Sequence, residues 1–255
     1  MSMPRFYVSP MASAGELPDD QGHHARDVLR LDNRQGVMIF DGEGQSAPAR
    51  IIIEKKHCHY ELTGPITVEP PPPCRVTIAT AVPKADRSHQ LLEQISQLGA
   101  AALVWLDCRY SVVHPVAEEG KMEKWRRLAV ESARQCGRNR LLVIKDPQTP
   151  RQFLARADLG TIIWTHVDAK LDLAQRLVAW RQQHDTDYPG AENMLLTIMI
   201  GPEGGWSPEE QDMLGQITAP VRLGENILRI ETAAAAAAAI AAACLPTVGT
   251  VHQRP

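Results

Sequence analysis

The alternation of hydrophobic and polar residues changes its period near residue 70. Before that point, short apolar runs alternate with polar residues, which is typical of strands. The sequence DGEG at residues 41–44 predicts a hairpin turn. One helical stretch is expected at residues 22–31. Together these elements indicate a small β-barrel of roughly 70 residues. The predicted strands cover residues 6–8, 37–40, 47–54 and 57–62.

After residue 73, apolar strand patterns alternate with helical ones. This order predicts an α/β domain with a mainly parallel sheet, in which ligands bind beyond the carboxyl ends of the strands. Residues 63–73, TGPITVEPPPP, suit a stiff connector, because four prolines fit neither a helix interior nor a central strand. We therefore expect domains at residues 1–70 and 71–255. The predicted strands are 76–82, 102–107, 161–165 and 194–200, and the predicted helices are 87–98, 121–135, 171–183 and 208–217.

Composition narrows the class of protein. The chain has 255 residues, 44% of them hydrophobic, and no apolar run reaches the ~20 residues of a membrane span. The N-terminus lacks the pattern of a signal peptide. Five scattered cysteines without a C-x-x-C pair indicate reduced thiols, so we expect a cytoplasmic protein. His57, Cys58 and His59 have no second ligand pair at suitable spacing, so no metal site is expected.

Charge is distributed unevenly. The net charge is −3, yet residues 121–140 contain seven basic residues against Glu123 and Glu131. Phosphate contacts are made locally, so this stretch is a candidate nucleic-acid surface. A solvated helix face is the alternative.

The loop at residues 201–205, GPEGG, follows a predicted strand and precedes a helix start. Ser207 can cap that helix, Pro208 suits its first position, and Glu210 completes a capping box. A phosphate loop is disfavoured, because no Lys or Arg follows the glycines and three carboxylates would repel a polyphosphate. A neutral or cationic ligand suits the loop better, and a purely structural turn is the alternative. The three carboxylates are Glu203, Glu209 and Glu210.

A second loop, LGENILRIET at residues 223–232, precedes seven consecutive alanines. Alanine has the highest helix propensity, so the sequence predicts a helix there. This helix is either a low-complexity surface helix or one that packs closely against other segments.

Both loops resemble those of the RsmE family, SPOUT-superfamily methyltransferases that modify N3 of a uridine in small-subunit ribosomal RNA. The resemblance covers nearly the whole chain, and its motifs follow one another in the expected order. Two positions depart from the family pattern: Ala85 replaces a glycine, and Ile230 replaces a threonine. Besides GPEGGWS and LGENILRIETA, the motifs are PRFY (4–7), HHARDVLRL (23–31), FDG (40–42), VPKADR (82–87), RYSVV (109–113) and ESARQCGR (131–138).

The resemblance implies a fold and partners. It implies an N-terminal PUA-like RNA-binding β-barrel and a C-terminal SPOUT α/β domain with a deep trefoil knot that binds S-adenosyl-L-methionine. It further implies 16S ribosomal RNA, within the small subunit, as the substrate, and a homodimer without membrane association. The implied RNA-binding residues are Arg5, His24, Arg30, Arg134 and Arg138. The implied cofactor-binding residues are Ile200, Gly201, Glu203, Gly204, Gly205, Leu223, Gly224, Ile227 and Leu228.

Methylation of uracil N3 requires loss of the imide proton. Arg229 is our candidate for stabilising the charge that develops on a uracil carbonyl. Glu231 is the candidate general base, with Glu203 as second choice. Two alternatives stay open: Glu231 and Thr232 only cap the alanine helix, or Arg229 only pairs with a structural carboxylate.

Three other functions would require different residues in the two loops. A SPOUT ribose 2′-O-methyltransferase acting on transfer RNA would carry a different element before the last helix. A non-catalytic RNA-binding or ribosome-assembly protein would be expected to lose the glycines or Arg229. A nucleotide hydrolase would need a basic residue after the glycines.

Overall fold

The computed structural model describes residues 3–55, 57–84, 87–187 and 194–245. Ala85, one of the two departures from the family pattern, lies outside these ranges. The chain divides into two compact units. One contains residues 1–70 together with 130–141, and the other contains residues 71–129 and 142–255. The division near residue 70 thus coincides with the change of hydrophobic pattern, while residues 130–141 group with the N-terminal unit.

The N-terminal unit is built on a six-stranded sheet. Its strands follow the order β1-β3-β4-β5-β2, β6 pairs with β4, and the β1–β3 pair is parallel. The predicted turn at 41–44 is confirmed, since the Asp41 carboxylate accepts hydrogen bonds from the N–H groups of Glu43 and Gln45. The elements are β1 (Arg5–Tyr7), β2 (Ala14–Glu16), α1 (Asp19–His23), the π-helix η1 (His24–Val28), β3 (Gly36–Phe40), β4 (Gln45–Glu54), β5 (His57–Leu62) and β6 (Thr67–Val68).

Two expectations for this unit need correction. The predicted helix at 22–31 starts earlier, at Asp19, changes to π-helical hydrogen bonding at His24 and ends at Val28. The proline-rich connector is not wholly outside the sheet, because Thr67 and Val68 pair with β4.

Residues 130–141 belong to the N-terminal unit through specific contacts. They include the C-terminal end of α3 (Glu119–Cys136). Arg134 Nε donates to the Arg5 carbonyl at 3.0 Å, and its guanidinium lies over the Phe6 ring. Arg5 in turn donates to the Arg138 carbonyl and to the Asn139 side chain. Arginine fixes both segments here because its planar fork offers several donors at once.

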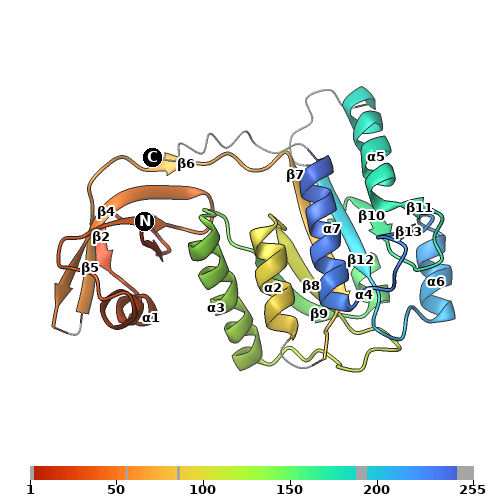
Figure 1. Ribbon diagram of the computed structural model, residues 1–255, viewed down its shortest axis with the longest axis horizontal. Coiled ribbons are helices and arrows are strands. Elements are labelled where there is room, and N and C mark those ends of the chain that lie inside the picture. Colours follow the sequence, from red (N-terminus) through yellow and green to blue (C-terminus); the bar gives the residue numbers. More distant parts are fainter. Residues whose placement is uncertain (1–2, 56, 85–86, 188–193, 246–255) are drawn as a thin grey trace. The chain divides into compact units, whose positions relative to one another are not determined.

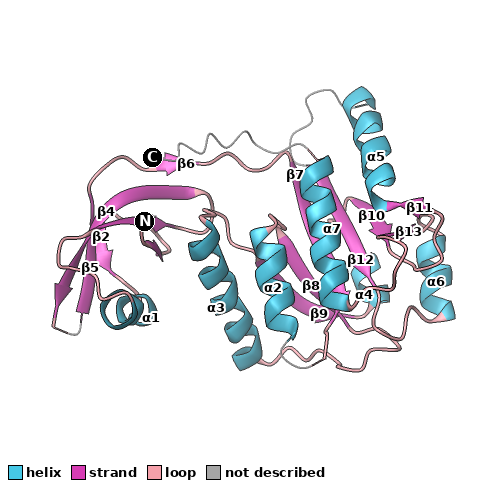
Figure 2. Cartoon of the chain, viewed as in Figure 1, coloured by secondary structure: helices cyan, strands magenta, loops and turns pink. Residues whose placement is uncertain are grey.

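The C-terminal unit contains the predicted parallel sheet (Figures 1 and 2). Its order is β10-β12-β7-β8-β9, and every pair is parallel. The sheet strands are β7 (Cys74–Ala81), β8 (Ala102–Leu106), β9 (Val143–Gln148), β10 (Thr161–Trp164) and β12 (Met194–Ile200). Two short strands, β11 (Leu171–Asp172) and β13 (Val221–Arg222), pair separately. The helices are α2 (Arg87–Gln97), α4 (Pro150–Leu154), α5 (Leu173–Asp187), α6 (Pro208–Gly215) and α7 (Ile230–Cys244).

The alanine-rich helix α7 packs closely on the sheet. It contacts β7 and β12 and lies beside α2 and α5 (Figure 1). Small side chains permit such close approach, so the alternative of a low-complexity surface helix is wrong. Its buried alanines are Ala233, Ala234, Ala237, Ala238 and Ala241.

In the ranges given above, no helix combines the length and the apolar character needed to cross a membrane.

Candidate active site

A pocket of about 400 Å³ lies where β10 and β12 end. Three loops form it: residues 165–168 after β10, residues 201–206 after β12, and residues 223–228 before α7. This position, beyond the carboxyl ends of parallel strands, is the one expected for ligands in α/β sheets. The structure places all nine predicted cofactor-binding residues around this one pocket: Ile200, Gly201, Glu203, Gly204, Gly205, Leu223, Gly224, Ile227 and Leu228.

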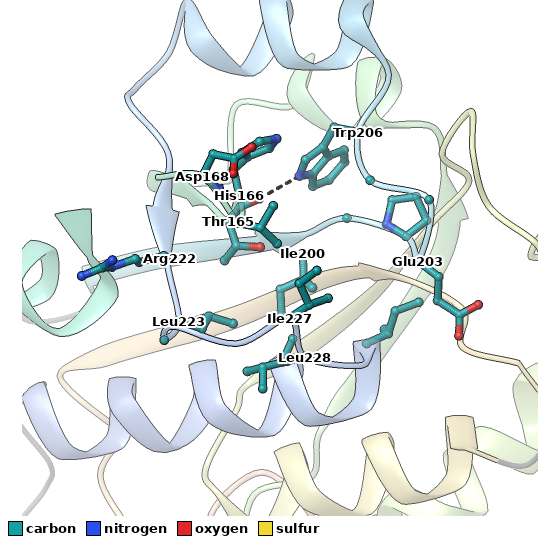
Figure 3. Close-up of a pocket in the computed structure, with 18 of the residues that line it drawn as sticks. Thr165, His166, Asp168, Ile200, Glu203, Trp206, Arg222, Leu223, Ile227 and Leu228 are labelled. Atoms are coloured by element: carbon teal, nitrogen blue, oxygen red, sulfur yellow. Dashed lines mark hydrogen bonds and ion pairs between the residues drawn. The ribbon is translucent and has the colours of Figure 1, made fainter. Parts of the chain in front are cut away.

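Apolar side chains form the centre of the pocket. Ile200, Ile227 and Leu228 lie together between the loops, whereas Arg222 and Glu203 lie at opposite ends (Figure 3). Trp206 is buried and donates from its indole Nε1 to the Thr165 carbonyl at 3.0 Å, which ties two of the loops together (Figure 3). An apolar cavity with a few polar groups at its ends is a usual small-molecule site.

The glycines of the 201–205 loop are required by the protein's own packing. A Cβ atom on Gly204 would lie 2.9 Å from the Cβ of Tyr110, closer than carbon atoms normally approach. Gly205 has a φ of +76°, a conformation that side-chain-bearing residues rarely adopt. The loop is therefore shaped by the neighbouring 107–111 segment as well as by any ligand.

Helix α6 starts as the sequence predicts. Ser207 Oγ accepts from the Glu210 N–H, and the Glu210 carboxylate accepts from the Ser207 N–H at 2.8 Å, so the capping box is confirmed. The other Glu210 oxygen accepts from the Arg109 N–H at 3.0 Å. One buried carboxylate thus fixes both the end of the glycine loop and the segment that follows β8.

The two candidate catalytic residues occupy different environments. Arg229 is exposed and stands at the N-cap position of α7 between two pocket-lining residues. Its carbonyl accepts from the Ala233 N–H, whereas its side chain makes no hydrogen bond or ion pair to any described residue. Glu231 is only 4% exposed, and its Oε1 atom accepts from Arg87 Nη1 at 3.3 Å. Within the described chain no side chain caps α7, so the alternative in which Glu231 and Thr232 cap this helix is wrong.

Arg87 was not predicted as a site residue. Its Nη2 atom also donates to Glu203 Oε1 at 3.2 Å, and its Nε donates to the Lys84 carbonyl. Arg87 therefore joins the 201–206 loop to the first turn of α7. Local periodicity could not reveal these contacts, because Arg87 is 116 residues from Glu203 and 144 from Glu231. The signal that could have drawn attention to Arg87 is its place at the end of the VPKADR motif.

The loop after β10 was also missed. Thr165, His166 and Asp168 line the pocket, and the signal that could have found them was their position at the end of a predicted strand. Arg222 lines it too, and its guanidinium pairs with Asp172 and Glu225. Among the described residues, His, Cys, Asp and Glu side chains form no group of three that could hold a metal ion.

The five predicted RNA-binding residues all lie in the N-terminal unit. Arg30 is exposed and follows the π-helix. His24 is half-buried, and its pKa is lowered, first by burial and then by the nearby Arg134 charge. Burial also lowers the pKa values of Arg5, Arg134 and Arg138. The structure thus brings Arg5, Arg134 and Arg138 together, but the guanidinium groups of Arg5 and Arg134 donate to backbone carbonyls within this cluster.

The sequence of this chain matches two family models and several known proteins. A family model described as an RNA methyltransferase domain matches residues 70–242, and one described as an RNA methyltransferase PUA domain matches residues 17–62. The ribosomal RNA small subunit methyltransferase E of Synechocystis sp. is 30% identical over 90% of this chain and 74% of its own length. That of Mycobacterium bovis is 30% identical over 91% of this chain and 88% of its own length.

Solved structures share the fold. A Legionella pneumophila protein in complex with S-adenosylmethionine (SAM) superposes with a TM-score of 0.80, 27% identity, and coverage of 95% of this chain and 98% of that chain. The ribosomal RNA small subunit methyltransferase E of Neisseria gonorrhoeae gives a TM-score of 0.79 at 24% identity, covering 94% and 97% of the two chains. This chain belongs to the ribosomal RNA small subunit methyltransferase E family.

Proposed function

We propose that this protein transfers a methyl group from SAM to N3 of one uridine in 16S ribosomal RNA of the small subunit. The observation that carries the proposal is the pocket, which the 201–206 and 223–228 loops form in a chain of this family. The proposal also takes from the family resemblance the identity of the methylated atom.

The lining of the pocket fits SAM. The pocket volume of about 400 Å³ lies within the range of small-molecule sites. Ile200, Ile227 and Leu228 offer apolar contact to an adenine ring, and the loop backbones offer N–H and C=O groups. Asp168 lines the pocket with an exposed carboxylate, whereas the charge of Glu203 is balanced by Arg87 and Lys84. A carboxylate in the lining suits a cationic ligand better than a phosphate. When bound, SAM supplies an electrophilic methyl group on a sulfonium centre.

In this proposal, Arg229 stabilises negative charge on a uracil carbonyl. Arg229 is exposed, and its neighbours in the chain, Leu228 and Ile230, line the pocket. The N-terminus of α7 begins at the same point, and its first N–H groups carry partial positive charge that no described side chain caps. Two sources of positive potential at one edge of the pocket favour an anionic uracil over a neutral one.

Glu231 takes the general-base role and Glu203 is the second choice. Glu231 follows Arg229 by two residues and is held by Arg87, while Glu203 lines the pocket and contacts both Arg87 and Lys84. A positioned base contributes about 10²–10⁴-fold to rate. Replacing each carboxylate by its amide separates the two candidates: the base is the one whose Gln variant loses this factor.

The N-terminal unit binds the RNA in this proposal, as a PUA-like barrel. His24 contacts the RNA from the π-helix and Arg30 from the residues that follow it, whereas Arg5, Arg134 and Arg138 form a partly desolvated cationic cluster. A substitution of Arg30 should weaken RNA binding and reduce its salt dependence by about one phosphate contact.

We further propose that the last helix threads a trefoil knot and that two copies form a dimer. The close packing of α7 against α2, α5, β7 and β12 is compatible with a knotted C-terminus. Sedimentation equilibrium measures the oligomeric state, and a monomer at micromolar concentration would contradict the dimer.

The function is tested with purified protein, unmodified small ribosomal subunits and SAM carrying a tritiated methyl group. The proposal predicts label in the RNA and saturable SAM binding by calorimetry. Arg229→Ala should retain SAM binding and lose most of the transfer. Full transfer by Arg229→Ala would disprove charge stabilisation by this residue, and absence of transfer by the wild-type protein would disprove the function.

A further inference from the structure

Arg87 joins three segments that are distant in the sequence. It is the first residue of α2, and α2 lies beside α7 (Figure 1). Its Nε donates to the Lys84 carbonyl at 3.1 Å, which fixes the direction of the guanidinium. Nη1 then reaches Glu231 at 3.3 Å and Nη2 reaches Glu203 at 3.2 Å. A guanidinium can make these contacts at once because its donors form a rigid planar fork.

The two carboxylates are engaged to different extents. Both oxygens of Glu203 have cationic partners, since Lys84 Nζ lies 3.5 Å from Oε2. Glu231 uses only Oε1, and its Oε2 is buried without a hydrogen-bond partner among the described residues. A buried acceptor without a donor is unfavourable, so it marks a place where a ligand can supply the missing donor.

We infer that Arg87 is a positioning residue that holds Glu231 through Oε1 and leaves Oε2 as the proton acceptor. This inference rests on the proposed function, in which the donor is the N3–H group of the target uracil. Arg87 also contacts Glu203 on the pocket loop. It therefore couples the placement of the base to the loop that binds the methyl donor.

A double-mutant cycle on kcat tests this inference. Glu231→Gln should lower kcat by about 10²–10⁴-fold. Arg87→Gln should lower kcat by roughly 10–100-fold, because a displaced catalytic group loses effective concentration. If Arg87 acts through Glu231, adding Arg87→Gln to Glu231→Gln should change kcat by less than about twofold. The control Lys145→Gln removes an ion pair to Asp158 away from the pocket and should leave kcat unchanged within about twofold.

A purely structural role of Arg87 gives a different result. The separate effects of the two substitutions on kcat would then multiply in the double variant, and that result overturns the inference. A wild-type kcat in Arg87→Gln also overturns it. If Arg87→Gln does not fold, Arg87→Lys replaces it, because lysine keeps the charge but offers one ammonium for two carboxylates. The kcat of Arg87→Lys is then compared in the wild-type protein and in Glu231→Gln. If the wild-type enzyme transfers no methyl group, the proposed function fails instead, so the two failures are distinguishable.

Discussion

The substitution Gly204→Ala tests whether the glycine loop is shaped by the protein or by its ligand. The added Cβ would lie 2.9 Å from Tyr110 Cβ and 3.3 Å from its carbonyl oxygen, so the 107–111 segment or the loop must move by several tenths of an ångström. Overpacking of this kind costs about 1–3 kcal/mol. For a unit of this size, that destabilisation lowers the Tm by about 2–12 °C.

The assay is thermal unfolding of the ligand-free protein, with Gly224→Ala as the matched control. Gly224 lines the same pocket, but no described atom lies within 4 Å of a Cβ placed there, so its free energy of unfolding should change by less than about 0.5 kcal/mol. SAM affinity is measured in parallel by calorimetry. If Gly204→Ala melts like Gly224→Ala and loses only SAM affinity, the ligand requires this glycine and the packing argument is refuted.

Three further predictions concern the cap of α6, the ion pair of Asp158 and the burial of the cysteines. Ser207→Ala removes the cap of α6 and should lower the free energy of unfolding by about 1 kcal/mol in urea titrations; an unchanged midpoint would contradict the role of the capping box. The hydrogen bond from Arg156, with Lys145 nearby, holds the pKa of the Asp158 carboxyl well below its usual 3.8. The ionised Asp158 carboxylate therefore stabilises the fold fully above its unfolded-state pKa, and this contribution is lost as the pH falls through the lower pKa of the folded state. Wild type and Asp158→Asn should differ in stability at pH 6 and converge in strong acid. Burial raises the pKa of the Cys74 thiol to about 12 and that of Cys108 as well, so a thiol reagent at pH 8 should modify exposed Cys136 first, and rapid native-state modification of Cys108 would contradict its burial.

Elements with a strong local pattern were predictable. The sequence predicts the strand at 194–200 with its observed bounds, because this strand is paired on both sides and is apolar except for Thr197. Strand β9 (Val143–Gln148) was missed. It lies at the sheet edge, where Lys145, Asp146 and Pro147 are tolerated because no further strand must pair there. Helix α4 (Pro150–Leu154) was missed too, although Thr149 and Gln152 form a capping box, because five residues give no periodicity.

The candidate site was predictable where adjacent residues carry its chemistry. The glycine spacing, the helix start and the preceding predicted strand marked the 201–207 loop as a candidate ligand loop, and the family resemblance implied its cofactor. The contacts of Arg87 and the close approach of Tyr110 to Gly204 come from tertiary packing between segments that are far apart in the sequence, by as much as 144 residues. Local periodicity carries no information on such pairs.

The most direct test of the central claim is the position of the methyl group in the product. Unmodified small subunits are incubated with the protein and SAM, the 16S RNA is digested to nucleosides and short fragments, and both are analysed by mass spectrometry. The proposed function predicts N3-methyluridine at one site, present with the wild-type protein and strongly reduced with Arg229→Ala. Methylation found only on a ribose, on another base, or not at all would contradict it.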